Sequence, residues 1–164
     1  MVSAAFVAAP PRPSEVLKRH FLALGGITQQ ALAEAMDVSK APKVLQDKAA
    51  EMFPKAETSI KAAYEAGVKI AVGTDAPAIP HGKNADELVT LVEWGMPPAA
   101  VLRSATTIAA DLINATDRGR LAEGLLADII AVPGDPLEDI TVTQAVTFVM
   151  KGGKVYKNEY ADGS

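Results

Sequence analysis

The stretch KIAVGTDAPAIPHG, residues 69–82, decides how the fold of this chain is interpreted. The apolar run VKIAV, residues 68–72, is too short for a helix and is flanked by glycines, which indicates a mostly buried strand. The run stops at Gly73-Thr74-Asp75 and gives way to a loop that contains prolines and one of the two histidines of the chain. The stretch therefore predicts a strand whose carboxyl end carries an acid.

Helical patterns precede this strand. Between Pro42 and Ala66 the apolar residues recur on one side of a helix, with a break or kink expected at Pro54. Gly67 suits the position after a helix end, where a positive φ is needed. Helix, glycine, buried strand and polar loop in this order are typical of an α/β unit.

Two further helices are predicted after the loop. Asn84 is placed to cap a helix over ADELVTLVEWG, residues 85–95. Pro97-Pro98 then starts a helix over AAVLRSATTIAADLINA, residues 99–115.

The chain changes character from Gly119 onward. Short β-type runs, DIIAV, VTFVM and KVY, alternate with glycine turns at Gly134 and Gly152-Gly153. This pattern predicts a small β region over residues 119–164.

The front end is expected to contain a strand and two short helices. SAAFV, residues 3–7, has strand character, and a proline cluster separates it from a helix capped by Ser14. Phe21 and Leu24 fall at helical spacing in that first helix, which ends at Gly25-Gly26. A second helix follows over QQALAEAMDV, residues 29–38.

Composition restricts the function classes. With 164 residues and 49% hydrophobic content the chain can form a real core, and its net charge of -4 offers no basic excess for nucleic acid. Cysteine is absent, which excludes disulfides and thiolate metal sites and fits a reducing cytoplasm. No apolar run approaches the ~20 residues that span a bilayer. We therefore expect a cytoplasmic protein with neither a nucleic-acid nor a membrane partner.

Asp75 is the first candidate for chemistry. Residues just beyond the carboxyl end of a buried strand lie where α/β folds bind ligands. Gly73 lets the backbone turn there, and the hydroxyl of Thr74 can orient the carboxylate. Such a carboxylate can ligate a metal, or accept a proton from a bound water and return it to a leaving group. The alternative, that Asp75 only caps a turn, stays open because Asp is common in turns.

The two histidines are weaker candidates than Asp75 for a metal ligand or a catalytic group. His81 lies in the loop sequence PHGKN, where a solvated or locally hydrogen-bonded imidazole is commoner than a metal ligand. His20 lies among charged residues of a predicted helix, and a solvated face explains it.

Several motifs in one order resemble the C-terminal part of the metal-dependent amidohydrolases, closest to their imidazolonepropionase-like and prolidase-like branch. The similarity covers roughly residues 43–157 and is carried by AGVKIAVGTDA, PHGKNADEL, VEWGMPPAAVLRSATTIAADLI, GRLAEGLLADIIAVPGDPLEDI and VTFVMKGGKVYK. It implies an α/β fold: the last strands and helices of a TIM-type (β/α) barrel over residues 1–118, with a helical segment over 13–66. Residues 119–164 would supply the C-terminal strands of a small β-sandwich and a tail.

The resemblance also implies a chemistry. Members of this family hydrolyse C–N bonds of small amides or dipeptides with one or two divalent metal ions, usually zinc. Asp75 would then be the metal ligand and general base, and Gly73 and Thr74 its supporting turn. His81 and Asn84 would fall in the loop that shapes the substrate pocket.

The chain departs from the family in its metal ligands. The family takes its other ligands from an H-x-H pair, a lysine or glutamate and further histidines on earlier strands, and none of these is present. The metal centre is therefore incomplete, and we do not expect this chain to be active alone. A barrel with about two of eight strands leaves edges unpaired, which predicts a homo-oligomer or a missing N-terminal part.

Residues 13–39 suggest a rival interpretation. They are similar to the start of antitoxin-type helix-turn-helix repressors, but the following segment KAPKVLQDKAAEMF has Pro42 near its start and acids on its surface, unlike a recognition helix. The favoured interpretation makes residues 3–7 the seventh barrel strand and residues 14–66 its connection to the eighth. A small DNA-binding regulator and a non-catalytic interaction module remain as alternatives.

Overall fold

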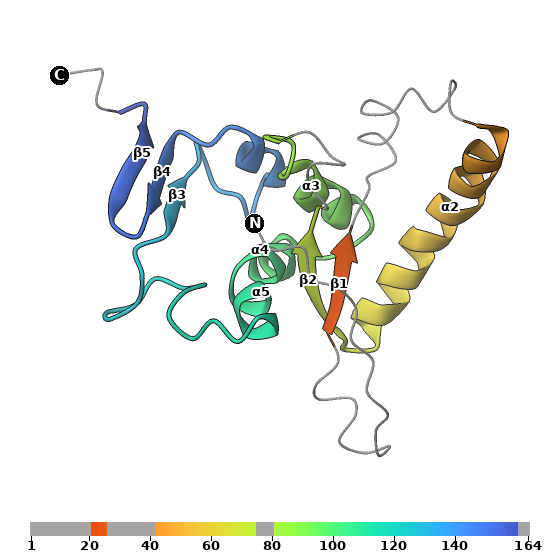
Figure 1. Ribbon diagram of the computed structural model, residues 1–164, viewed down its shortest axis with the longest axis horizontal. Helices are drawn as coiled ribbons and strands as arrows, with labels where there is room; N and C mark the ends of the chain where they lie inside the picture. Colours follow the sequence, from red (N-terminus) through yellow and green to blue (C-terminus); the bar gives the residue numbers. More distant parts are fainter. Residues whose placement is uncertain (1–20, 26–41, 75–80, 161–164) are drawn as a thin grey trace, which may run out of the picture.

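The computed structural model describes residues 21–25, 42–74 and 81–160. Within these ranges a parallel pair of strands is flanked by helices, and a small antiparallel sheet follows toward the C-terminus (Figure 1). The predicted α/β architecture with a separate small β region is confirmed at this level.

The parallel pair joins β1 (Phe21–Gly25) to β2 (Lys69–Gly73). Phe21 lies opposite Lys69, and the pairing continues in register to Gly25 opposite Gly73. The helix predicted through Phe21 and Leu24 is therefore wrong at these residues. An apolar run this short fits either structure by its spacing, and pairing with a buried strand decides between them.

The position of β1 also corrects two dependent expectations. The strand that precedes β2 and pairs with it is at residues 21–25, so the connection to β2 is shorter than the predicted 14–66. The first helix of the antitoxin-type motif was predicted to include Phe21–Gly25, and this is wrong because these residues form a strand. The predicted strand at 3–7, His20 and the helix over 29–38 lie outside the described residues.

The crossover from β1 to β2 contains α2 (Lys43–Glu65). The helix continues through Pro54, so of the break or kink predicted there the break is wrong. Gly67 has the expected positive φ, 77°. Its N–H donates to the Tyr64 carbonyl at 2.9 Å, and the N–H of Val68 donates to Ala63 at 3.0 Å, as in a Schellman C-cap.

After the loop come α3 (Asp86–Glu93), α4 (Pro98–Ala105) and α5 (Thr107–Leu112). Pro98 opens α4 as predicted. The single helix predicted over residues 99–115 is instead divided at Thr106, whose φ of -125° and ψ of -91° are not helical. The Thr106 hydroxyl donates to the Leu102 carbonyl at 2.7 Å, a local bond that competes with the helical ladder.

The core lies where β2 meets the helices. Ile70, Leu91 and Val101 are almost completely buried, and they come from β2, α3 and α4. Ile140 adds a contact from η3 (Ile140–Gln144), the 3-10 helix that packs against α3. This core holds the carboxyl end of β2 and the start of α3 in place.

The small sheet consists of β3 (Ile129–Ala131), β4 (Phe148–Lys151) and β5 (Lys154–Asn158), antiparallel in that order. These are the three predicted β runs. Gly152 and Gly153 have φ of 54° and 79°, which a two-residue type I′ hairpin requires, and they connect β4 to β5 as expected. None of the helices within the described ranges has the length and apolar character needed to cross a membrane.

Candidate functional site

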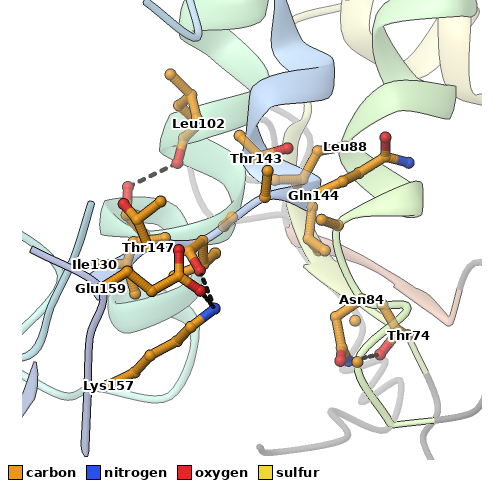
Figure 2. Close-up of a pocket in the computed structure, with 18 residues that line it drawn as sticks. Thr74, Asn84, Leu88, Leu102, Ile130, Thr143, Gln144, Thr147, Lys157 and Glu159 are labelled. Carbon is orange, nitrogen blue, oxygen red and sulfur yellow. Dashed lines mark hydrogen bonds and ion pairs between the residues drawn. The ribbon is translucent and has the colours of Figure 1, made fainter. Parts of the chain in front are cut away.

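The carboxyl end of β2 is tied to the start of α3. Thr74 follows β2 directly and is buried, with 6% of its surface exposed. The amide Nδ2 of Asn84 donates to the Thr74 hydroxyl at 2.7 Å (Figure 2). Because residues 74 and 84 flank the connection that contains Asp75, this bond closes that connection at its base.

Asn84 does not cap α3, contrary to prediction. The residue before the helix is Ala85, whose side chain forms no capping hydrogen bond. The first turn instead carries Asp86 and Glu87, whose charge suits a helix N-terminus. The amide of Asn84 bonds to the buried hydroxyl of Thr74, because a buried polar group left without a partner is costly.

The structure brings Gly73, Thr74 and Asn84 together. Asp75 lies outside the described residues. His81 lies in an exposed turn at the far end of the same connection. The roles assigned to these five residues stay predictions.

A cavity of about 750 Å³ runs from this site to the small sheet. On one side its lining comes from the end of β2 with Thr74, from the residues around the start of α3 and from the end of α4. On the other side it comes from residues 143–147, Ile130, Lys157 and Glu159 (Figure 2). Apolar side chains such as Val72, Leu88, Leu102 and Ile130 make up much of the lining.

The polar groups along the cavity pair with one another. The Nζ of Lys157 lies 2.8 Å from Oε1 of Glu159 and donates to the Val146 carbonyl at 2.5 Å. The Nε2 of Gln144 donates to Oδ1 of Asp86 at 2.8 Å and so joins η3 to the start of α3. An exposed ion pair of this kind contributes at most about 1 kcal/mol, so these bonds orient the rim more than they stabilise it.

Glu87 is a buried acid that the sequence reasoning missed. Only 3% of its surface is exposed, and its Oε2 has no hydrogen-bond partner among the residues that the structure describes. Desolvation by burial raises the pKa of this carboxyl to about 7. Its spacing of four residues from Leu91, which is fully buried, was the available signal, since residues i and i+4 share a helix face.

The described residues do not form a metal centre by themselves. No group of three or more His, Cys, Asp or Glu side chains within the described ranges is arranged to hold a metal ion. Asp75, the predicted ligand, is outside those ranges.

Comparison with known proteins decides the family. Residues 11–156 match the sequence model described as the amidohydrolase family. The chain belongs to the amidohydrolase family. This confirms the resemblance seen in the sequence, and because the match runs through residues 13–39 it supports the amidohydrolase interpretation over a separate DNA-binding motif.

Individual proteins that are similar to this chain support the same family. The ochratoxinase of Aspergillus niger is 38% identical over 140 residues, which are 80% of this chain and 29% of that enzyme. A crystal structure of a Xaa-Pro dipeptidase with bound methionine in the active site is 41% identical, with a TM-score of 0.71 over 79% of this chain and 33% of that one. A prolidase complexed with n-methylphosphonate-l-proline is 31% identical, with a TM-score of 0.70 over 80% of this chain and 33% of that one. The chain therefore spans about a third of the length of its relatives.

Proposed function

We propose that the chain supplies the C-terminal portion of an amidohydrolase that cleaves the C–N bond of a small amide or dipeptide. The observation that carries this proposal is the buried Thr74 at the carboxyl end of β2, bonded to Asn84 and followed directly by Asp75. In parallel α/β folds this position faces the ligand. The names of the relatives, an ochratoxinase and a Xaa-Pro dipeptidase, support a small-molecule or dipeptide substrate.

The proposal assigns roles along the connection after β2. Asp75 is one ligand of a divalent metal, with zinc expected from the family resemblance, and acts as general base. Gly73 and Thr74 form its supporting turn, and His81 and Asn84 contact the substrate. The chain has no H-x-H pair, so the other metal ligands must come from outside it. Hydrolysis by this chain alone is not expected.

The fold proposal follows the same family. The parallel unit of β1, α2 and β2 together with α3 to α5 would form the last part of a (β/α) barrel. The sheet of β3, β4 and β5 would be the C-terminal strands of the flanking sandwich. A parallel strand pair joined by a crossover helix is the repeating unit of such a barrel.

A chimeric enzyme tests the catalytic role. In the Aspergillus niger ochratoxinase, the segment that matches this chain would be replaced by the chain itself, and amide hydrolysis and bound zinc would be measured. We expect Asp75→Asn to lower kcat by about 10²–10⁴-fold, the usual size of a lost general base, and to reduce bound zinc. Asp111→Asn, which removes an exposed carboxylate on α5, is the matched control and should leave both unchanged.

Two results would contradict the proposal. One is a chimera in which Asp75→Asn hydrolyses the amide as fast as Asp111→Asn. The other is stoichiometric zinc in the isolated 164-residue chain, since that would mean that the chain completes a metal site without ligands from elsewhere.

A further inference from the structure

We propose that Glu87 is a positioning residue for the candidate site: while its buried carboxyl is uncharged it holds the first turn of α3 in place, and so keeps Asn84 against Thr74. Ionisation of this carboxyl releases the turn and loosens the site. The inference rests on the proposed function in one respect, since that proposal makes Asn84 a substrate contact. The behaviour of the turn itself can be measured without catalysis.

The first turn of α3 is attached to two other elements. Just before the helix, the amide of Asn84 donates to the hydroxyl of Thr74 at the end of β2, at 2.7 Å (Figure 2). Within the turn, Oδ1 of Asp86 accepts a hydrogen bond from Gln144 of η3 at 2.8 Å. Backbone hydrogen bonds across residues 83–89 join both attachments in one turn. A displacement of this turn therefore reaches the end of β2.

Glu87 anchors the same turn from the inside. It shares a helix face with Leu91, four residues further on, which is fully buried in the core with Val101 of α4 and Ile140 of η3. Only 3% of the Glu87 surface is exposed, and within the described ranges its Oε2 has no hydrogen-bond partner. Burial therefore favours the neutral acid, because an unpaired buried charge costs far more than an unpaired neutral group.

The charges around Glu87 do not offset its ionisation. Burial is what raises its pKa to about 7. The described elements packed against it are α4 and η3, and the charged residues of these two and of α3 itself are Asp86, Glu93 and Arg103. Two of these are acids, and Arg103 is exposed. The charged carboxylate is more stable outside the core, where water and the positive end of the helix dipole reach it.

Proton release therefore links the buried acid to the site near neutral pH. Below pH 7 the neutral side chain stays in the core, and the bond between Asn84 and Thr74 is kept. Above pH 7 the charged side chain is driven toward solvent, and the turn that carries Asn84 moves with it.

NMR of the 164-residue chain tests this link directly. The side-chain amide signal of Asn84, assigned by its loss in Asn84→Ala, is followed from pH 5 to pH 8.5. We expect it to move between two limiting positions with a midpoint near pH 7. In Glu87→Gln it should stay at the low-pH position throughout, because the amide side chain is neutral at every pH.

Two control variants identify the group that titrates. Glu93→Gln removes an exposed carboxylate near the end of the same helix and should leave the titration unchanged. His81→Gln removes the exposed imidazole of the connection, because imidazoles in general titrate close to this pH interval, and should also leave it unchanged. The carboxyl carbon signal of Glu87 in the parent chain provides a measurement that needs no variant, and it should titrate with the same midpoint.

The chimeric ochratoxinase then tests the consequence for the reaction. A residue that only stabilises the fold would leave the pH dependence of KM unchanged. We expect the ratio of KM in the parent chimera to KM in the Glu87→Gln chimera to rise by about fivefold between pH 6 and pH 8.5, the size of one lost neutral hydrogen bond. The ratio of the kcat values should stay constant, because Asn84 is proposed to contact the substrate and not to transfer a proton.

Three outcomes would overturn the inference. The first is a Glu87 carboxyl that titrates near its ordinary pKa of 4.5. The second is a Glu87 carboxyl that titrates near pH 7 while the Asn84 amide signal does not move. The third is a Glu87→Gln chain whose Asn84 signal titrates like that of the parent. A KM ratio that is independent of pH, with the NMR titrations as expected, would support the positioning of the turn and count against the substrate contact in the proposed function.

Discussion

Two predictions about stability concern single residues beside the site, and the first concerns Glu87. Its carboxyl is buried on α3, beside α4 and η3, and within the described part of the chain its Oε2 has no hydrogen-bond partner. The described residues of those two neighbouring elements include one charged side chain, Arg103, which is exposed. Burial therefore favours the neutral acid, and the pKa rises from 4.5 to about 7.

This predicts a pH-dependent stability. The contribution of protonated Glu87 is fully present below its unfolded pKa of 4.5 and is lost as pH rises through about 7. The free energy of unfolding should fall by up to about 3 kcal/mol across that interval. Glu87→Gln should remove this fall, because the amide is neutral at every pH. Urea unfolding at pH 5 and pH 8 measures it, with Glu93→Gln, an exposed site near the end of α3, as control. An unchanged pH slope in Glu87→Gln would contradict the assignment.

The second residue-scale prediction concerns the bond between Asn84 and Thr74. A double-mutant cycle with Thr74→Val and Asn84→Ala should give a coupling energy of about 1 kcal/mol in the free energy of unfolding. Thr74→Ser keeps the hydroxyl and should lose less stability than Thr74→Val. The cycle isolates this pair from the other interactions of each residue. A coupling near zero would show that the 2.7 Å contact does not stabilise the base of the connection.

At the scale of elements, glycine positions mark helix ends and turns reliably. Gly67 ends α2 and the pair Gly152-Gly153 turns between β4 and β5, each with the positive φ expected of it. These signals are local, since an L side chain at such a φ is strained whatever surrounds it. The helix division at Thr106 depends on a side-chain bond to Leu102, and the spacing of apolar residues does not reveal it.

The end of α2 offers a direct test. Gly67→Ala should lower the free energy of unfolding by about 1 kcal/mol, because its φ of 77° is unfavourable for alanine. A Cβ at this position would meet no atom within 4 Å, so the cost is that of the backbone alone. Gly67→Asn should cost less, since asparagine tolerates the left-handed region. Thermal or urea unfolding of the two variants measures the difference; equal losses would argue against a backbone origin.

At the scale of the whole molecule, η3 connects the C-terminal part of the chain to the helices, since Ile140 packs into the core and η3 contacts α3. Gln144 reaches Asp86 across 58 residues of sequence, while the cavity keeps the small sheet apart from β2. The partners predicted from the sequence, a homo-oligomer or the rest of a larger fold, both require an exposed surface of this kind.

The sequence by itself determined what depends on neighbouring residues. The strand at residues 69–73, the helix end at Gly67, the hairpin at Gly152-Gly153 and the order of the family motifs can all be read locally, because backbone conformation and motif spacing act over a few residues. Only the tertiary structure decided the rest. Phe21–Gly25 is extended because it pairs with β2. Asn84 turns to Thr74 because that hydroxyl lies beside it. The pKa of Glu87 rises to about 7 because residues far apart in the sequence close around it and exclude water.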